Sequence, residues 1–304
     1  MRPVKVSIII VSFNTKELLR NCLRSIYENT RDIEFEVIIS DNNSNDGTLA
    51  MLKSEFPRVI YVANNENLGF GAGNNRGLDV AKGECVLFLN SDTLLLNNAV
   101  KLFYECWENR EPGVAAMGTN LVDGSGHITE SYGNFPNTSS LLKNMLHHFI
   151  AFYIKNVMKI LCLDISKLRP KPMYLHRVGT VDYVTGADLF MANDESARFD
   201  ENFFLYFEET DIQWRLRKKG KRSILVDGPR ISHLIRGGRL AENDDVLRFG
   251  SFSIIQSEIS RVRYAKKNLS RLTAFLLKIM ISAQWLSPYI LKNTIPFFKP
   301  LWKI

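Results

Sequence analysis

The sequence predicts an α/β protein with a mostly parallel central sheet flanked by helices. Runs of β-branched and other apolar residues alternate with segments of helical periodicity through residues 1–120. The apolar runs are continuous, which is typical of strands buried on both faces of a parallel sheet. Polar clusters follow these runs directly, as expected at the ligand-binding edge of such a sheet. Hydrophobic residues make up 45% of the 304 residues and charged residues 23%, a globular composition that excludes a disordered or fibrous chain.

The predicted elements alternate between strand and helix. The first strand covers residues 4–13, and Asn14 with Glu17 has the spacing of a capping box at the start of the next helix. The second strand covers 35–40 and ends at a loop-forming polar cluster. The later elements are a helix over 48–56, a strand over 59–63, a Gly/Asn-rich loop and helix over 64–81, a strand over 84–89, a helix over 97–109 and a strand over 114–118. Right-handed crossovers bring the carboxyl ends of parallel strands to one edge, so the polar clusters should meet in one crevice.

Two further segments have a helical pattern. Residues 141–176 carry six Lys/Arg and one acidic residue, which favours a basic amphipathic helix on an anionic membrane surface, with a core-packing helix as the alternative. Residues 272–298 are more apolar but are interrupted, among others by Pro288. A membrane span needs about 20 mostly apolar residues and is the alternative to an interfacial helix there. We expect an α/β domain over 1–240, with 141–176 as a helical insert, and a basic helical segment over 241–304.

Charge and cysteine content restrict the partners and the compartment. The net charge is +7, yet the segment from Arg261 to Ile304 holds nine Lys/Arg and no acidic residue, which leaves residues 1–260 at −2. We therefore expect no nucleic-acid partner for the main body. The cysteines are widely spaced and match no metal-binding pattern, which favours reduced thiols in a cytoplasmic protein. They are Cys22, Cys85, Cys106 and Cys162. The apolar run after Met1 is too short for a signal peptide, so export is not expected.

Two of the polar clusters carry carboxylates at the ends of predicted strands. The cluster over residues 41–48 places Asp41 and Asp46 beside a helix start, where an Asx turn with an N-cap explains them equally well. The cluster over residues 90–92 is Asn-Ser-Asp. Its carboxylate can hold a hard divalent cation that also binds a diphosphate, or it can cap a helix. Each cluster alone leaves both interpretations open.

Taken together, these clusters belong to an ordered set of motifs. The segments of the set are 6–14, 37–47, 67–71, 74–77, 87–92, 186–187, 199–204, 207–211 and 214–215, with Gly220 and His233. In this order the chain resembles the family 2 inverting glycosyltransferases with a GT-A fold, particularly the rhamnosyltransferase-like branch, over roughly residues 4–238. The resemblance implies a Rossmann-like, mostly parallel sheet flanked by helices, here with a C-terminal amphipathic helical extension.

The resemblance implies a nucleotide-sugar donor. Relatives hold the base and ribose with the loop after the first strand and the acid after the second strand, which here are Ser12, Asn14 and Asp41. A carboxylate suits the imide N–H of uracil or thymine as a hydrogen-bond acceptor. Asn67 and Asn75 are expected to line the same pocket.

The resemblance also implies a divalent metal. Asp92 matches the last acid of the family's Asp-x-Asp motif, with Asn90 in place of the first acid, and the intervening Ser91 is expected to contact the donor. His233 matches the histidine that completes the metal shell in relatives, although a lone histidine is more often structural. These residues predict a site for Mg²⁺ or Mn²⁺, which would neutralise the departing diphosphate.

On the acceptor side, relatives use a carboxylate as the base that deprotonates the attacking hydroxyl. The matching residue is Glu209; because it replaces an Asp and is one methylene longer, Glu208 remains a rival. Trp214 and Arg215 are expected to contact the acceptor. Their structural alternatives are a core position for Trp214 and a helix-stabilising ion pair between Arg215 and Asp211.

The sequence therefore predicts an inverting hexosyltransferase of the rhamnosyltransferase-like type. It would move L-rhamnose or a hexose from a dTDP- or UDP-sugar to a glycan or polyprenyl-diphosphate-linked glycan in bacterial cell-surface polysaccharide synthesis, as a peripheral protein at the inner face of the plasma membrane. The alternatives are a catalytically inactive nucleotide-sugar-binding homologue and a nucleotidyltransferase. A dinucleotide oxidoreductase is not expected, because the glycines at 69, 71 and 73 follow the third strand and Asn74 stands where the fingerprint needs its last glycine.

Overall fold

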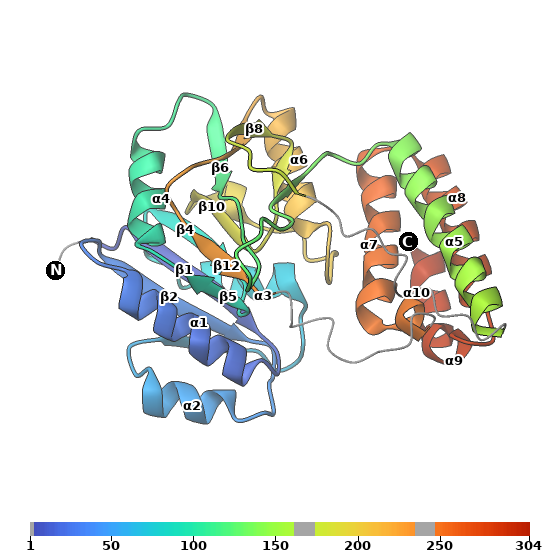
Figure 1. Cartoon of the computed structure of the whole chain (residues 1–304), viewed down its shortest axis with the longest axis horizontal. Helices are drawn as coiled ribbons and strands as arrows, with labels where there is room; N and C mark the ends of the chain where they lie inside the picture. The colour runs from blue at the N-terminus through green and yellow to red at the C-terminus, as the bar shows by residue number, and fades with distance from the viewer. Residues whose placement is uncertain (1–2, 161–173, 235–246) are drawn as a thin grey trace. The chain divides into compact units, whose positions relative to one another are not determined.

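The computed structural model describes residues 3–160, 174–234 and 247–304, and the chain divides into two compact units (Figure 1). The first unit comprises Met1–Phe135, Met173–Phe204 and Glu208–Gly238. The second comprises Pro136–Pro172, Leu205–Phe207 and Arg239–Ile304. The predicted boundary at residue 240 and the predicted helical insert beyond residue 160, up to 173, lie outside the described residues.

The first unit is built on a sheet whose strands alternate with helices. Its strands are β1 (Val6–Ser12), β2 (Phe35–Asp41), β3 (Ile60–Ala63), β4 (Cys85–Leu89), β5 (Thr93–Leu95), β6 (Val114–Gly118), β7 (Tyr132–Gly133), β8 (Gly179–Val181), β9 (Tyr183–Val184), β10 (Asp188–Ala192), β11 (Arg222–Leu225) and β12 (Ile231–His233). Its helices are α1 (Lys16–Asn29), α2 (Thr48–Glu55), α3 (Phe70–Leu78), α4 (Ala99–Glu108), α6 (Glu208–Lys218) and the 3-10 turn η2 (Glu195–Ala197). These bounds agree closely with the elements predicted up to residue 118.

The large sheet has eight strands in the order β3-β2-β1-β4-β10-β6-β11-β8. The strands from β1 to β4 pair in parallel, as do β6 and β11, whereas β10 is antiparallel to both β4 and β6. Two short pairs, β5 with β12 and β7 with β9, lie outside this sheet. The predicted fold class, a mostly parallel sheet flanked by helices, is confirmed.

Helices cover both faces of the sheet, and β1 shows how the sequence achieves this (Figure 1). Side chains alternate along a strand, so Ile8 and Ile10 pack with apolar residues of α1, α2 and α4 on one face. Ile9 lies on the other face, in the cluster that contains side chains from α3 and α6. The continuous apolar run of β1 is therefore explained by burial on both faces.

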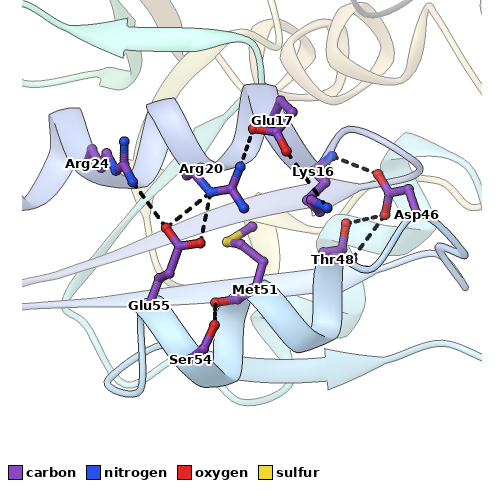
Figure 2. A network of polar contacts seen from close by, with 9 residues as sticks. All are labelled: Lys16, Glu17, Arg20, Arg24, Asp46, Thr48, Met51, Ser54 and Glu55. Atoms are coloured by element: carbon purple, nitrogen blue, oxygen red, sulfur yellow. Dashed lines mark hydrogen bonds and ion pairs between the residues drawn. The ribbon is translucent and has the colours of Figure 1, made fainter.

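The capping box predicted around Glu17 is wrong. The N-cap of α1 is Thr15, whose side chain makes no capping bond. Instead, the first N–H of α1, on Lys16, donates to Asp46 Oδ2 (2.8 Å) from the loop after β2. Asp46 Oδ1 accepts bonds from the N–H and hydroxyl of Thr48, so one carboxylate caps the starts of both α1 and α2 (Figure 2). Partial burial opposes ionisation of Asp46, but these hydrogen bonds outweigh it and lower the pKa of the carboxyl.

The second unit is helical. Its elements are α5 (Thr138–Ile160), η3 (Leu247–Gly250), α7 (Phe252–Asn268), α8 (Arg271–Trp285), α9 (Leu291–Thr294), η4 (Ile295–Phe297) and α10 (Phe298–Lys303). Its core combines Met145 and Phe152 of α5 with apolar residues of α7 and α8. The apolar stretch 272–298 is not one helix, because α8 ends at Trp285. Among the helices that the structure describes, none has the length and apolar content needed to cross a membrane.

Candidate active site

The loops after β1 and β2 are tied together by hydrogen bonds at the carboxyl edge of the sheet. Asn14 N donates to Ser44 Oγ (2.8 Å), and Asn45 N donates to Asn14 Oδ1 (2.9 Å). Ser44 in turn donates from its hydroxyl to Asp41 Oδ1 (2.6 Å) and from its N–H to Asp41 Oδ2 (3.0 Å). Asn14 has a φ of 53°, a left-handed conformation that asparagine adopts more readily than most residues. The two loops therefore form one fixed surface.

Asp41 forms the floor of this surface. Its side chain is buried, and Tyr61 donates a hydrogen bond to its Oδ2 (3.2 Å). Burial, followed by the charge of Asp41, raises the pKa of Tyr61 to about 12, so this phenol stays a donor at neutral pH. Ser12 pairs with Asp41 across β1 and β2, and its hydroxyl is 3.2 Å from that of Thr15. The structure thus brings the predicted donor residues Ser12, Asn14 and Asp41 together.

Asn67 has a structural task in the same region. Asn42, which is buried and which the sequence analysis did not single out, donates to Asn67 Oδ1 (3.1 Å) and to Gly69 O (3.0 Å), and accepts from Asn64 (2.9 Å). Asn67 Oδ1 also accepts from Gly69 N (3.0 Å). At Gly69 φ is 84°, and a Cβ there would lie 2.1 Å from Phe204 O, so only glycine fits. The donor contact predicted for Asn67 stays a prediction.

Asn75 is buried on α3 and clamps a distant segment. Its amide nitrogen donates to Phe199 O (3.0 Å) and Glu201 Oε1 (3.1 Å), and its oxygen accepts from Phe199 N (3.0 Å). The amide therefore holds the chain that leads toward α6. Its predicted contact with the donor also stays a prediction.

The predicted metal ligands meet at the short β5–β12 pair. His233 is opposite Thr93, which places it beside the loop after β4. His233 Nε2 is 3.3 Å from Asp92 Oδ1 and 3.4 Å from the side-chain amide of Asn90. Asp92 is buried, and its carbonyl accepts from Leu234 N (2.9 Å). In the described part of the chain, no group of three or more His, Cys, Asp or Glu residues collects at one point; a metal here would draw on the Asn90 amide or on substrate oxygens for further ligands.

The predicted base lies beside the same segment of chain as the Asn90–Asp92 loop. Glu208 and Glu209 are the first two residues of α6. A Cβ at Gly186 would be 3.6 Å from Glu209 Cβ, and the next residue, Ala187, accepts a hydrogen bond from Asn90 N (3.1 Å). Glu209 and the loop of Asp92 therefore flank one dipeptide, Gly186–Ala187, rather than lying on separate faces of the unit.

The environment of Glu209 favours a carboxyl group that changes charge near neutral pH. Burial raises its pKa to about 7, and the charge of Glu130 adds to this, while the N–H groups at the start of α6 act in the opposite direction. Within the described residues, its Oε2 atom is buried and has no hydrogen-bond partner. A carboxylate of this kind can accept a proton from a bound hydroxyl.

The two residues predicted on the acceptor side differ in what they contact. Arg215 pairs with the buried Asp211 (3.2 Å) and donates to the carbonyl of Arg198, so the helix-stabilising ion pair is present. Trp214 packs edge-on against Phe135, with ring centroids 4.9 Å apart. Its Nε1 is buried without a partner among the described residues. Contact of either side chain with an acceptor stays a prediction.

Sequence reasoning missed two polar residues next to the Gly186–Ala187 dipeptide. Asp188 is fully buried at the start of β10, and its Oδ2 accepts from Thr119 N (2.7 Å). Thr185 precedes the dipeptide, and its hydroxyl is buried. Asp188 left a detectable signal, an acid opening an apolar strand, whereas a single threonine leaves none.

Comparison with known proteins places the chain in a family. The model of the glycosyl transferase family 2 matches residues 7–162, just over half of the chain. The chain belongs to this family. The resemblance drawn from the ordered motifs is thus confirmed, and this family 2 member carries the Asp41 and Asp92 loops within the matched region.

Curated relatives match parts of the chain. An uncharacterized glycosyltransferase, YfnE of Bacillus subtilis, is 41% identical over 111 residues, 36% of this chain and 28% of YfnE. A GalNAc(5)-diNAcBac-PP-undecaprenol beta-1,3-glucosyltransferase of Campylobacter jejuni is 32% identical over 132 residues, 42% of each protein. The chain thus matches less than half of the length of these relatives.

Solved structures confirm the fold of this family 2 member. GalNAc-T7, solved with UDP, GalNAc and Mn²⁺, superposes with a TM-score of 0.59 at 14% identity, covering 99% of this chain and 56% of GalNAc-T7. At that identity the likeness establishes a shared GT-A-type fold alone.

Proposed function

We propose that the protein is an inverting glycosyltransferase that uses a nucleotide-sugar donor and a divalent cation. The observation that carries this proposal is the placement of Asp92 with His233 and of Glu209 on either side of Gly186–Ala187. One side of that dipeptide offers ligands for a cation and the other a buried carboxylate with an open oxygen.

The donor end is supported by the surface built from the β1 and β2 loops. The Asp41 carboxylate would accept from the imide N–H of uracil or thymine, while Ser12 and Asn14 supply hydroxyl and amide groups toward the ribose. Ser91 lies beside the proposed metal ligands and would contact the diphosphate. Because GalNAc-T7 binds UDP, a UDP-sugar is the first donor to test, with dTDP-L-rhamnose next.

The Asp92 and His233 side chains fit a divalent cation. Two adjacent ligands at about 2.1 Å from an octahedral ion lie about 3.0 Å apart, close to the observed 3.3 Å between Asp92 Oδ1 and His233 Nε2. The Asn90 amide offers an oxygen if its two ends are exchanged, which is a matter of assignment. Bound Mg²⁺ or Mn²⁺ supplies charge neutralisation for a leaving diphosphate.

Glu209 is proposed as the general base, with Glu208 as its rival. The proton of the acceptor hydroxyl passes to Glu209 Oε2 while the acceptor oxygen forms a bond to C1 of the sugar. The bond from C1 to the diphosphate breaks, and its electron pair leaves with the nucleoside diphosphate. One displacement of this kind inverts the anomeric centre and needs no covalent intermediate.

We place this activity in bacterial surface polysaccharide synthesis, with a glycan or polyprenyl-diphosphate-linked glycan as acceptor. The Campylobacter jejuni relative, by its name, transfers glucose to an undecaprenol-linked glycan. The second unit supports contact with an anionic lipid surface at the inner face of the plasma membrane, because its C-terminal segment has nine cations and no acid. Its exposed apolar side chains include Leu146, Ile150, Ile154, Leu272, Phe275 and Ile279.

The activity is tested by incubating the protein with UDP-glucose, UDP-N-acetylglucosamine, UDP-galactose and dTDP-L-rhamnose, each with Mn²⁺ or Mg²⁺. We expect slow, metal-dependent release of nucleoside diphosphate that falls at least about 100-fold in Asp92→Asn. The matched control is Asp32→Asn, an exposed aspartate of the same unit. Tight donor binding without release in any acceptor mixture would identify an inactive homologue. Pyrophosphate release from a nucleoside triphosphate and a sugar phosphate would identify a nucleotidyltransferase.

The membrane contact is tested separately. Vesicles of phosphatidylcholine with and without phosphatidylglycerol are sedimented with the protein at low and high salt. We expect binding only to the anionic vesicles and release at high salt. Absence of binding at low salt removes the membrane part and leaves the catalytic part standing.

A further inference from the structure

The start of α6 lies alongside β9 in a fixed register. The Gln213 side chain accepts from Val184 N (2.8 Å) and donates to Val184 O (2.7 Å). Glu209 is one turn earlier on the same face of α6 and packs against Gly186, two residues beyond Val184. Thr185 lies between these two contacts. Its backbone N–H donates to Ser131 O (3.1 Å), which continues the β7–β9 pairing.

Three buried polar atoms of this region have no hydrogen-bond partner among the described residues. They are Thr185 Oγ1, Glu209 Oε2 and Trp214 Nε1. A buried polar atom left without a partner is destabilising, so such atoms are uncommon unless a ligand binds them. Their chemistry is complementary: a carboxylate accepts, an indole N–H donates and a hydroxyl does both. A sugar hydroxyl is both a donor and an acceptor, so it can form hydrogen bonds with each of these groups.

An aromatic surface adjoins these atoms. Tyr183 belongs to β9, and Thr185 directly follows this strand. Phe135 packs between Tyr183 (centroids 6.0 Å apart) and Trp214 (4.9 Å). Rings with a polar edge combine apolar contact for the C–H face of a sugar with hydrogen bonds for its hydroxyls.

The local charge disfavours an anionic ligand beside Glu209, while Lys218 Nζ is 5.5 Å from the centre of the Trp214 ring. Glu130 acts on both Glu209 and Tyr183 and raises the pKa of each, after the larger effect of burial. Glu130 and Glu209 are thus close enough for their charges to interact. A phosphate placed here would face both carboxylates and be repelled, whereas a neutral sugar ring would not.

We propose that Thr185, Trp214 and Tyr183 form a subsite for a neutral sugar residue of the acceptor, in which the Thr185 hydroxyl holds the attacking hydroxyl beside Glu209 Oε2. The inference rests on the proposed glycosyltransferase activity and specifies its acceptor. Thr185 is a positioning residue, and Trp214 Nε1 bonds a second oxygen of the same ring. A polyol phosphate chain is disfavoured by Glu130.

The test uses the full chain, Mn²⁺, two sets of acceptors, and the donor that supports nucleoside diphosphate release in the activity assay. The neutral set is the p-nitrophenyl glycosides of glucose, galactose, N-acetylglucosamine and rhamnose; the anionic set is glycerol phosphate and ribitol phosphate. Thr185→Val keeps the β-branched shape and removes the hydroxyl. We expect it to raise KM for the neutral acceptor about 5- to 20-fold, while KM for the donor stays within twofold. Thr185→Ser should restore most of the affinity.

Controls separate a local effect from misfolding. Thr180→Val on β8 removes an exposed hydroxyl of the same unit and should change nothing. Trp214→Phe keeps an aromatic ring, loses the N–H and should also raise acceptor KM. Unchanged KM in both Thr185→Val and Trp214→Phe would overturn the subsite, and so would preference for the anionic set.

Binding provides a second readout that needs no turnover. In the presence of UDP and Mn²⁺, the neutral glycosides should bind the wild type and bind at least fivefold more weakly to Thr185→Val. Failure of the wild type to bind any of them overturns the subsite, whereas the proposed activity fails only if metal-dependent donor hydrolysis is also missing.

Discussion

Two glutamates, one in each unit, have similarly raised pKa values and different surroundings. Burial raises the pKa of both Glu209 and Glu258 to about 7. Both oxygens of Glu258 accept hydrogen bonds, from Trp285 Nε1 (2.6 Å) and Gln284 Nε2 (3.2 Å). The charge of Arg261, whose own pKa is lowered by burial, acts on the same group. Glu209 Oε2 has no partner among the described residues.

A raised pKa shows only that a carboxyl group is buried. A carboxylate oxygen without a hydrogen-bond partner is the better indication that a ligand binds there. Perturbed acidity is common at active sites, but structural networks perturb it equally. Glu258 belongs to such a network in the core of the second unit. Glu209 is at a helix start beside Gly186, where its open oxygen would serve the proposed base. The two glutamates should therefore respond in opposite ways to substitution.

The largest expected effect is on turnover. Glu209→Gln keeps the size of the side chain and removes the base, so the rate of sugar transfer should fall by about 10²- to 10⁴-fold. Glu258→Gln should leave the rate within about threefold. Both are measured as kcat and kcat/KM at pH 8 on protein with a native-like far-UV CD spectrum.

Glu208→Gln is the informative companion, because Glu208 is the rival base. A larger loss in Glu208→Gln than in Glu209→Gln would reassign the role. Equal losses in Glu209→Gln and Glu258→Gln would remove the distinction on which the comparison rests.

The second prediction concerns stability, for which the substitution of Glu258 should have a larger effect than that of Glu209. Glu258→Ala leaves two buried donors without an acceptor and a buried cation without its counter-charge, so it should cost about 3 kcal/mol of unfolding free energy. Glu209→Ala removes an oxygen without a partner among the described residues and the hydrogen bonds of the carboxylate with the N–H groups at the start of α6, so it should cost less, about 1 kcal/mol. Urea denaturation followed by tryptophan fluorescence and CD measures both, with Trp285 reporting on the second unit.

For each variant, the urea midpoint from CD must agree with the midpoint from fluorescence before a free energy of unfolding is assigned, because the two units can unfold separately. A greater loss of stability in Glu209→Ala than in Glu258→Ala would show that Glu209 is a structural residue.

The local pattern of the sequence was sufficient for most of the sheet. The β-branched runs that became β1, β2 and β4 carry their own signal, since burial on both faces demands continuous apolar residues. The antiparallel β10 carries no comparable signal for its neighbours, because its place between β4 and β6 depends on partners that are about 70 to 110 residues away in the sequence. The cap of α1 failed for the same reason: Asp46 competes with Glu17 only after the two loops have come together.

The site residues also divide into those that the sequence pattern indicates and those that only the folded structure brings to notice. Asp41 and Asp92 stand out only as members of the ordered motif set, because an Asx turn or a helix cap explains each cluster alone equally well. The pairing of Asp92 with His233 came from the resemblance to a family, since no local spacing links the two. Thr185 was missed because a single threonine is ordinary until its hydroxyl is seen to be buried without a partner among the described residues.

The third prediction concerns Asp188, whose carboxyl group has one bonded oxygen and is in this respect intermediate between Glu258 and Glu209. Asp188 has one oxygen bonded by Thr119 N and one without a partner in the described residues, and burial raises its pKa to about 8. Because the folded state holds this proton more tightly, stability falls as pH rises from the unfolded pKa near 4 to about 8, by at most about 1.4 kcal/mol per pH unit.

Asp188→Asn keeps an acceptor for Thr119 and cannot ionise. Its Tm relative to wild type should rise from pH 5 to pH 8 and level off above that. A Tm difference independent of pH would show that Asp188 is ionised in the folded protein throughout this range.

The smallest effect is expected from the exposed neighbour of Glu209. The charge of Glu130 raises the pKa of Glu209, and the base acts only when ionised, so kcat/KM should increase with pH through about 7. In Glu130→Gln the pKa of Glu209 falls, and the acidic limb of the profile should move to lower pH by a few tenths to one unit, as a partly solvated charge permits. Activity at pH 6 then increases while the plateau above pH 8 is unchanged.

The control is Glu105→Gln, which changes an exposed glutamate on α4 and should leave the pH profile unchanged. A limb that stays in place in Glu130→Gln would mean that burial alone sets the acidity of Glu209, and the contrast with Glu258 would then rest on the open oxygen without any help from charge.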